Sequence, residues 1–295
     1  MKHLFDKTKE LVLRSTDEER ILAVKKFKWI GYTQASTILK NLNDLLEYPE
    51  RHRMPNILLI GDSNNGKTAL LNKFVKANES YVNEETQELI VPTLMLQAPH
   101  EPDEKRFYNA ILEQLYAPYK SSEKNEIRQQ RVIHLLKKVK LKLLIIDEIH
   151  HMLAGTISKQ RSFQNLLKFL SNELKISMVC AGTRDAFNAV QSDPQLGNRF
   201  EPKVLKKWRN DQEFLRLLAS FEKLLPLKEP SNLIESSLAT KILARSEGLI
   251  GEVSRILELA SILAIESKVE KINKNILDHI DYIPPSDRKK MIHRL

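Results

Sequence analysis

The 295 residues have room for one large domain, or for a core and a smaller second domain. No apolar run approaches the ~20 residues of a membrane-spanning helix, and the charged first 20 residues lack the apolar centre of a signal peptide. The single cysteine, Cys180, excludes an intramolecular disulfide and a cysteine-based zinc cluster, so we expect a cytoplasmic protein with no membrane partner. The net charge of +9 is consistent with a polyanionic partner.

The first 55 residues predict a helical extension. Thr16 and Glu19 have the spacing of a capping box at the start of a helix. Gly31 interrupts the helical pattern, which resumes up to residue 48 with apolar residues on one face. Two prolines, Pro49 and Pro55, then frame a short basic loop.

Residues 56–206 predict an α/β core of the RecA-like type, with a parallel sheet between helices. Short apolar runs typical of buried parallel strands occur at 56–61, 89–97, 141–147 and 176–182, and a fifth strand is expected near 203–208. Segments with helical periodicity separate them, at 66–78, 103–116, 123–139 and 160–174. Strands that alternate with helices imply a parallel sheet that is covered on both faces.

The rest of the chain predicts helices alone. Residues 207–285 contain four helical segments and no convincing strand, which indicates a small helical second domain. Pro284 and Pro285 are expected to end this domain, and residues 286–295 form a basic tail.

A phosphate-binding loop follows the first predicted strand. Residues 61–68, GDSNNGKT, match the pattern G-x-x-x-x-G-K-[ST] in full, with a strand before and a helix after. Glycines let the backbone N–H groups wrap a phosphate, Lys67 should reach the β- and γ-phosphates, and Thr68 should bind Mg²⁺. The predicted nucleotide-binding residues are Gly61, Asp62, Ser63, Asn64, Asn65, Gly66, Lys67, Thr68 and Ala69.

Two carboxylates end the apolar run "LLIIDE" at 143–148. Ligand sites in open α/β sheets lie at the carboxyl ends of the strands. We expect Asp147 to hold Mg²⁺ through water and Glu148 to polarise the attacking water. The neighbouring His150 and His151 lack the H-E-x-x-H spacing of a zinc site, so we expect solvated or packed histidines there. No N-K-x-D guanine motif is present, which favours ATP over GTP.

Three further residues are candidates for sensing or assisting hydrolysis. Thr183 directly follows the apolar run at 176–182, and this position would place its side chain near the γ-phosphate. Arg199 precedes the last predicted strand, where an arginine could enter a neighbouring subunit's site; Arg184 is the alternative. Arg255 lies on a helix of the second domain, from which it could touch the γ-phosphate.

With these residues in place, the sequence resembles the AAA+ ATPases and, more closely, the TniB/TnsC family of transposition regulators. The longer strings that carry the resemblance are DEERI (17–21), RMPNILLIGDSNNGKT (53–68), LLIIDEIHHM (143–152), AGTRDA (181–186), NRFEP (198–202) and EGLIGEVSRILELA (247–260). The resemblance implies an ATPase core with a small helical lid, ATP and Mg²⁺ as ligands, and hydrolysis used as an assembly switch.

The resemblance also implies partners. Family members assemble as rings or filaments on double-stranded DNA without sequence specificity, and they link a TniQ-like target-selection protein to a DDE transposase. DNA contacts in the family come from the segment after the second core strand. The residues at corresponding places here are Lys105, Arg106, Lys120, Ser121, Ser122 and Lys124. Lysines and small hydroxyls at these positions suit phosphate contacts that read no base.

Two other functions fit the same motifs. One is a helicase loader or an initiator-like AAA+ ATPase, and the other is a nucleotide-gated protein scaffold that binds no DNA. Filament formation that depends on DNA would separate the transposition regulator from the protein scaffold.

Overall fold

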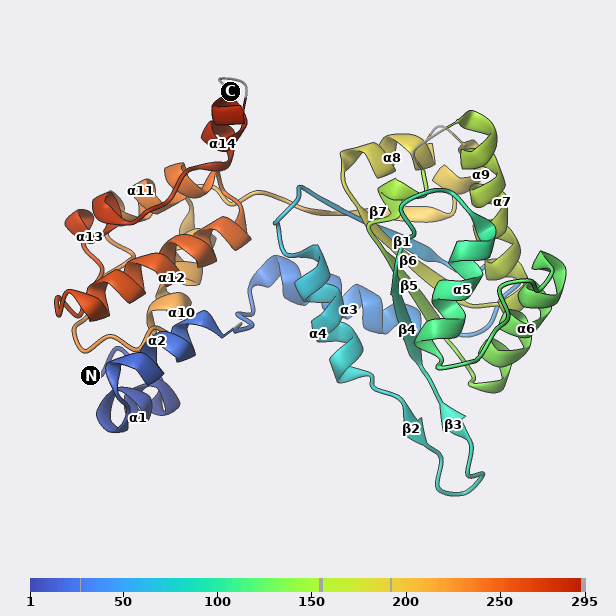
Figure 1. The fold of residues 1–295 in the computed structure, drawn as a ribbon, viewed down its shortest axis with the longest axis horizontal. Helices are drawn as coiled ribbons and strands as arrows, with labels where there is room; N and C mark the ends of the chain where they lie inside the picture. Colours follow the sequence, from blue (N-terminus) through green and yellow to red (C-terminus); the bar gives the residue numbers. More distant parts are fainter. Residues whose placement is uncertain (27, 154–155, 192, 293–295) are drawn as a thin grey trace. The chain divides into compact units, whose positions relative to one another are not determined.

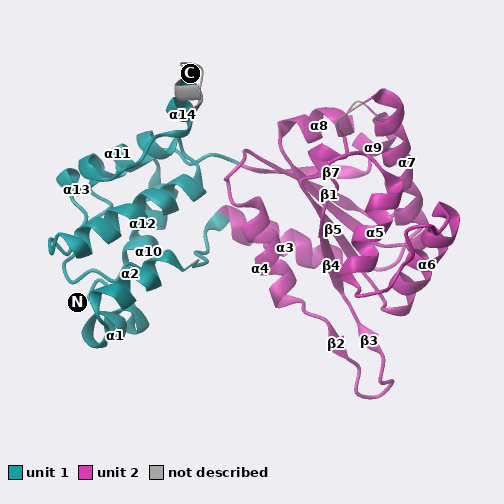
Figure 2. Ribbon diagram, viewed as in Figure 1, with its two compact units in different colours: residues 1–33, 206–295 teal, residues 34–205 magenta. Residues whose placement is uncertain are grey.

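The computed structural model describes residues 1–26, 28–153, 156–191 and 193–292. The chain divides into two compact units (Figure 2). One unit is the continuous segment 34–205, and the other combines residues 1–33 with residues 206–295. Each unit has its own hydrophobic core.

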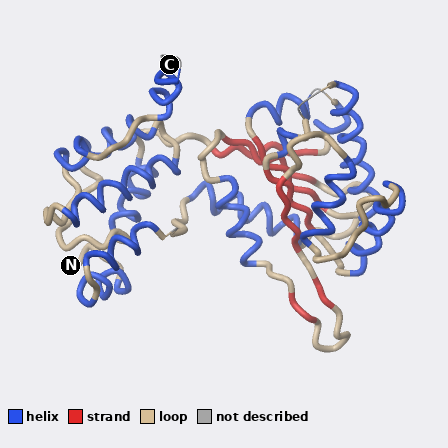
Figure 3. The backbone as a smooth tube through the Cα atoms, viewed as in Figure 1, coloured by secondary structure: helices blue, strands red, loops and turns tan. Residues whose placement is uncertain are grey.

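A five-stranded parallel sheet forms the centre of the segment 34–205 (Figure 3), which confirms the predicted α/β fold. The strand order is β4-β5-β6-β1-β7. The strands are β1 (Asn56–Gly61), β4 (Thr93–Gln97), β5 (Leu143–Asp147), β6 (Ser177–Gly182) and β7 (Phe200–Leu205). Every residue of β1, β5 and β6 is buried, because helices cover both faces of these central strands.

The covering helices lie in two layers (Figure 1). The α3 and α4 helices lie on one face, and α5, α6 and α7 lie on the other. Leu58 and Ile60 of β1 join the core cluster that contains Phe107 of α5 and Phe163 of α7. The bounds are α3 (Thr33–Leu46), α4 (Lys67–Ala77), α5 (Glu104–Gln114), α6 (Asn125–Lys138), η1 (Ile149–His151) and α7 (Ile157–Leu174), with α8 (Arg184–Gln191) and α9 (Pro194–Gly197) following β6.

The apolar run 89–97 does not form the single strand that was predicted. Leu89–Ile90 (β3) pairs antiparallel with Tyr81–Val82 (β2) in a hairpin, and only Thr93–Gln97 joins the main sheet. Pro92 lies at the break, since proline has no N–H to donate to a ladder. Figure 1 shows the hairpin as an extension beyond the ends of α4 and β4.

The last strand begins three residues earlier than predicted, at Phe200 instead of Lys203. This edge strand is buried only at its two ends, Phe200 and Leu205. Because it carries Pro202 and charged residues between them, its sequence lacks the apolar run that marks the central strands.

The other unit consists of helices in its described residues. From the N-terminal segment come α1 (Asp6–Arg14) and α2 (Asp17–Lys25), and the capping box of Thr16 with Glu19 is present as predicted. The remaining helices are α10 (Gln212–Glu222), α11 (Ser236–Ser246), α12 (Ile250–Glu266), α13 (Lys274–His279) and α14 (Pro285–Ile292).

A buried arginine joins the N-terminal segment to the C-terminal helices. Arg20 is fully buried, and its guanidinium donates to both carboxylate oxygens of Glu270, at 2.8 and 2.7 Å, and to Pro226 O at 2.9 Å. Val24 and Ile30 join the same core as Phe214 and Leu257. Residues 1–33 therefore belong to the compact unit of the C-terminal helices, whereas the predicted extension 1–55 grouped them with residues 34–55.

The predicted basic tail starts as a helix. Pro285 is the first residue of α14, a position where its missing N–H costs nothing. After the two prolines, which were expected to end the helical domain, the chain thus forms one more helix. Residues 293–295 of the predicted tail lie outside the described residues. In the described part of the chain, no helix has the length and apolar character needed to cross a membrane.

Candidate nucleotide site

The predicted phosphate loop lies at the carboxyl end of β1, between β6 and β7 in the sheet. Gly66 has φ of 85°, and Asn64 has φ of 59°, so the loop turns through left-handed conformations that glycine adopts freely. At Gly61 an added Cβ would lie 3.2 Å from Leu205 Cβ. The two motif glycines are therefore needed for backbone conformation and for close packing against β7.

Asn65 holds the loop against the sheet. Its side chain is buried, and Nδ2 donates to Leu205 O at 2.8 Å. Asn65 N donates to Asp62 O at 3.3 Å, which closes the turn. The motif pattern leaves this position free, so its anchoring role could not be predicted from the pattern.

The side chain of Lys67 folds back onto the backbone of the phosphate loop. The side chain is 4% exposed, and Nζ donates to Gly61 O at 2.9 Å and to Asp62 O at 3.0 Å. Burial lowers the pKa of Lys67, while Glu148, Asp147 and Asp62 act against the shift. An ammonium held by carbonyls in this way is placed to bind an anion in the loop.

Thr68 and Asp147 converge although 79 residues separate them. Thr68 Oγ1 donates to Asp147 Oδ2 at 2.5 Å, and Asp147 Oδ1 accepts from Glu148 N at 2.8 Å. The two side chains offer oxygen ligands, which Mg²⁺ prefers. This geometry fits a magnesium ion held by Thr68 directly and by Asp147 through water.

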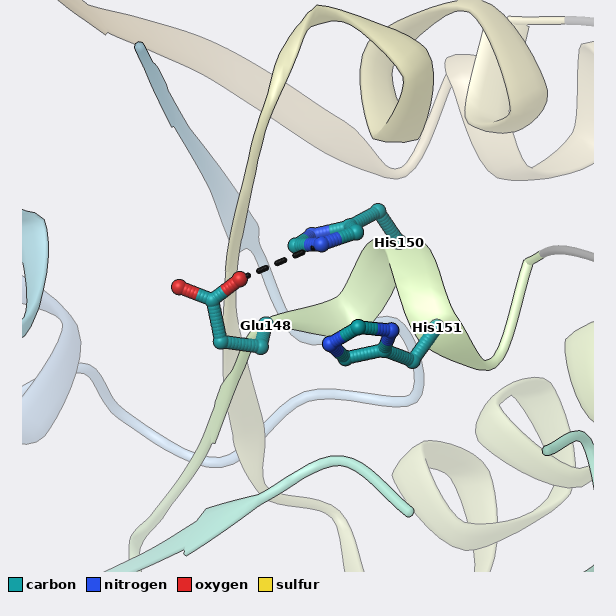
Figure 4. A group of neighbouring side chains, drawn as sticks. All are labelled: Glu148, His150 and His151. Atoms are coloured by element: carbon teal, nitrogen blue, oxygen red, sulfur yellow. Dashed lines mark ion pairs between the residues drawn. The ribbon is translucent and has the colours of Figure 1, made fainter. Parts of the chain in front are cut away.

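Glu148 has an unusual backbone conformation, with φ of 55° and ψ of 37°. A non-glycine residue in this region costs of order 1 kcal/mol or more, and such residues cluster at functional sites. The conformation turns the side chain toward the histidines of η1 (Figure 4). Glu148 Oε2 lies 3.2 Å from His150 Nε2, and burial lowers the pKa of His150.

A cavity of about 810 Å³ opens beside these residues. Thr68, Asp147, Glu148 and His151 contribute to its wall, together with residues of α4 and β4. The carboxyl end of β5 is therefore reachable from solvent.

Thr183 follows β6, the strand between the phosphate-loop strand β1 and the acid strand β5. This strand order agrees with the position that was predicted for a γ-phosphate sensor. The neighbouring Arg184 is exposed and lies at the same edge of the sheet. The sensing role of Thr183 stays a prediction.

Arg199 lies at the other edge of the sheet. It directly precedes Phe200, which is paired with Asn56 at the start of β1, whereas the phosphate loop begins at Gly61. Five strand residues at ~3.3 Å each give ~17 Å along the sheet between Asn56 and Gly61. Arg199 Nη1 donates to Asn172 Oδ1 at 2.9 Å, and its buried Nε has no partner among the described residues. Arg199 therefore lies at the opposite end of β1 from the phosphate loop of its own chain.

Arg255 belongs to the helical unit, where it is half exposed and pairs with Glu258 on the same helix. Its predicted role at the γ-phosphate stays a prediction.

The six predicted DNA-contact residues are all exposed on the loop between α5 and α6 and on the first turn of α5. Lys105 Nζ donates to Ser121 O at 2.8 Å, so residues 16 apart in sequence share one surface. Arg128 fixes the loop from its buried side: the residue is fully buried, and its guanidinium donates to Lys120 O at 2.9 Å. Arg131 Nη1 donates to Pro118 O at 3.0 Å and pairs with Glu123. The sequence pattern gave no signal for this support.

Several solved structures share this fold. The ORC1 protein of Aeropyrum pernix in complex with DNA matches with a TM-score of 0.57 and 14% sequence identity. The match covers 92% of this chain and 69% of the ORC1 chain. The ORC2 protein of the same organism, in ADPNP-ADP complexes, matches with a TM-score of 0.57 and 14% identity. That match covers 86% of this chain and 69% of the ORC2 chain. The RuvB Holliday junction branch migration motor of Thermotoga maritima matches with a TM-score of 0.51 and 16% identity. The match covers 86% of this chain and 71% of the RuvB chain.

The wrapped loop, the Thr68–Asp147 pair and the sheet order thus define an AAA+ P-loop ATPase. The family model of the bacterial TniB protein matches residues 20–210, and the chain belongs to this family. A search of curated proteins finds no match to the sequence.

Proposed function

We propose that the protein is an ATP-dependent, sequence-nonspecific DNA-binding regulator of DNA transposition. It oligomerises on target DNA and links a TniQ-like target-selection protein to a DDE transposase. The observation that carries the proposal is an assembled phosphate loop and acid pair in a chain of the TniB family.

ATP is the ligand that the site suits. In this proposal residues 61–69 cradle the phosphates, and Lys67 neutralises the β- and γ-phosphates. Thr68 and Asp147 would hold Mg²⁺, which bridges phosphate oxygens and offsets their charge. Residues 56–206 act as the ATPase core and 207–285 as the lid that carries Arg255, flanked by the extension 1–55 and the tail 286–295.

Hydrolysis would serve as a switch. Glu148 is the base that orients and polarises water, and Thr183 senses the γ-phosphate. Arg199 supplies positive charge to the site of a neighbouring subunit. The position of Arg199 at the far edge of the sheet supports a role in trans.

DNA contacts would come from the exposed surface of Lys105, Arg106, Lys120, Ser121, Ser122 and Lys124. These side chains can bind phosphates but offer no rigid pattern for reading bases. Many subunits on one duplex would then add weak contacts, which gives cooperative binding that depends on DNA length.

Electron microscopy tests the proposal. The protein is imaged with duplex DNA and a non-hydrolysable ATP analogue, and then without either component. We expect rings or filaments only when both are present. Assemblies that form equally well without DNA would instead favour a nucleotide-gated protein scaffold, and nucleotide-dependent capture of a replicative helicase would favour a loader.

A further inference from the structure

Glu148, the proposed catalytic base, forms a cluster with two histidines that have no role in the proposed hydrolysis. Glu148, His150 and His151 each offer one ligand atom, and these atoms all lie within 4.8 Å of one another (Figure 4). They come from one short segment, the end of β5 and the turn η1. Two imidazoles and a carboxylate are a donor set that zinc and similar ions accept, with a fourth position left open.

We propose that Glu148, His150 and His151 bind a transition-metal ion of the zinc class, and that this ion takes Glu148 out of hydrolysis. This inference deepens the proposed function and rests on it for the consequence, since Glu148 is the proposed base. The binding site itself stands on geometry alone.

The spacing of the ligand atoms suits a metal. Glu148 Oε2 and His150 Nε2 are 3.2 Å apart. Two ligands on a tetrahedral zinc ion, at bonds of ~2.0–2.1 Å, lie about 3.3 Å apart. The His150 and His151 rings have centroids 4.3 Å apart, and all three ligand atoms lie within 4.8 Å of one another, so a third ligand lies close by.

An ion can reach the cluster from solvent. The side chains of Glu148 and His150 are 30% and 24% exposed, and Glu148 and His151 line the cavity of about 810 Å³. The ring of His100 lies edge-on to that of His151, with centroids 5.4 Å apart, which makes His100 a candidate fourth ligand.

The outer surroundings predict reversible binding. His150 Nδ1 is buried and has no hydrogen-bond partner among the described residues. Metal-bound histidines in strong sites usually donate this second N–H to a carboxylate or carbonyl. The site should therefore bind zinc more weakly than a structural zinc site does, as a reversible inhibitor requires. Mg²⁺ should not compete for it, because imidazole favours zinc-class ions.

Cobalt provides a direct test that needs no ATP. The full chain without an affinity tag is titrated with Co²⁺, and its visible absorption is recorded; Zn²⁺ binding is then measured by calorimetry. We expect one ion per chain and at least a tenfold weaker affinity in the double variant His150→Gln/His151→Gln. The matched control His52→Gln/His134→Gln changes two exposed histidines elsewhere and should bind like the wild type. His100→Gln reports on the fourth ligand.

Inhibition provides the second measurement. At saturating Mg²⁺, added Zn²⁺ should suppress ATP hydrolysis by the wild type, and His151→Gln should resist it relative to its own rate without Zn²⁺. Equal metal affinity in the wild type and the double variant, with both folded by circular dichroism, would overturn the site. A chain that binds Co²⁺ but hydrolyses no ATP would count against the proposed function and leave the metal site intact, whereas hydrolysis without a Co²⁺ signal would do the reverse.

Discussion

Lys67 carries the positive charge nearest the phosphate loop, and it is buried against two backbone carbonyls. A phosphate in the loop would replace these carbonyls as its partner, and hydrogen bonds to charged groups are worth about 1.5–3 kcal/mol each. Lys67→Ala should therefore weaken ATP binding by roughly 10²-fold. A fluorescent ATP analogue measures the affinity, and Lys73→Ala, an exposed lysine on α4, is the control.

Tight ATP binding by Lys67→Ala, with Lys73→Ala unchanged, would remove Lys67 from the phosphate site. The pH dependence gives a second check. Because burial lowers the pKa of Lys67, its charge is lost at a lower pH than that of a free lysine. ATP affinity should thus decline with rising pH before exposed lysines titrate.

Glu148→Gln keeps the shape of the side chain but removes its basic oxygen. ATP binding should survive, while kcat falls by about 10²–10⁴, the usual contribution of a general base. Assemblies on DNA should then persist. Glu79→Gln, on the wall of the same cavity, controls for charge and should hydrolyse ATP at the wild-type rate. Near-normal kcat in Glu148→Gln would mean that another group orients the water.

Residues of the site divide into those that a local pattern reveals and those that it does not. Lys67 and Thr68 lie in one continuous motif, and Asp147 and Glu148 end an apolar run, so short-range chemistry was enough to predict them. Asn65 depends on Leu205, and the cluster at His150 depends on the backbone turn at Glu148. The Asn65 contact is long-range and the histidine cluster depends on a local left-handed turn, and neither follows from a residue spacing.

At the scale of elements, burial decides which strands the sequence reveals. The central strands β1, β5 and β6 are buried throughout and mostly apolar, and they were predicted to within two residues. The edge strand β7 carries polar residues between its buried ends, and β2 and β3 have only two residues each, so neither forms a long apolar run. The short helices α8 and α9 were also missed, since four to eight residues give too few turns for a periodic signal.

The loop between α5 and α6 is the element on which DNA binding is predicted. Lys105 and Lys120 are exposed, and the Lys105–Ser121 hydrogen bond puts the first turn of α5 on the same surface as the loop. Replacing both lysines with alanine should weaken binding to two unrelated duplexes alike. It should reduce the slope of log K against log salt by roughly 0.9 for each lost phosphate contact.

The double variant Lys137→Ala/Lys140→Ala is the matched control. It removes the same charge from exposed positions at the far end of α6, where the lysines pair with Glu173 and Glu88. Equal slopes in the two double variants would move the DNA surface elsewhere. Arg288 of the tail is poorly placed for this, because its guanidinium binds the Glu252 carboxylate at 2.7 and 3.0 Å.

The loop also depends on its buried support. Arg128→Met keeps the volume of the side chain but removes the bond to Lys120 O and leaves Glu123 with Arg131. Losing the hydrogen bond of this charged group to Lys120 O costs about 1.5–3 kcal/mol in unfolding free energy. We expect weaker DNA binding with ATP affinity intact, measured on the same preparation. DNA binding equal to the wild type would show that the loop keeps its shape without Arg128.

At the scale of the whole molecule, the helical unit depends on contacts between the two ends of the chain. Burial alone would raise the pKa of Glu270, but hydrogen bonds from Arg20 and Lys228 outweigh it and the pKa is lowered. The pKa of Asp17 falls from 3.8 to about 2 through hydrogen bonds from Arg20 and Lys268. Carboxylates with lowered pKa values stabilise the fold above their unfolded pKa and lose that contribution as pH falls.

Arg20→Met should therefore destabilise the helical unit by about 3–5 kcal/mol at neutral pH, because Glu270 loses its main partner in a buried site. The difference from the wild type should shrink as pH falls from about 4.5 toward 2, where both carboxylates gain protons. Thermal unfolding across that range measures it. Arg216→Met removes an exposed ion pair with Glu213 and should cost less than about 1 kcal/mol. A difference that stays constant with pH would mean that Arg20 acts by packing alone.

Assembly is where Arg199 acts in our proposal. Because it lies ~17 Å below the phosphate loop of its own chain, only a second subunit can bring it to a site. An arginine that enters in this way accelerates hydrolysis by about 10³–10⁵ in the best cases. Arg199→Ala and Lys67→Ala should each abolish most ATP hydrolysis alone, measured in the presence of DNA. In a mixture, about a quarter of randomly formed interfaces combine an intact loop with an intact arginine, so activity should partly return.

The alternative arginine supplies the matched control. Arg184 lies at the same edge of the sheet as the phosphate loop, so it is placed to act within its own chain. A mixture of Arg184→Ala with Lys67→Ala should then recover no activity, because neither subunit keeps a complete site. Recovery with Arg184→Ala and none with Arg199→Ala, in mixtures shown to co-assemble, would reverse the two roles. Hydrolysis by Arg199→Ala alone at the wild-type rate would remove this arginine from the reaction and leave its bond to Asn172 as its only role.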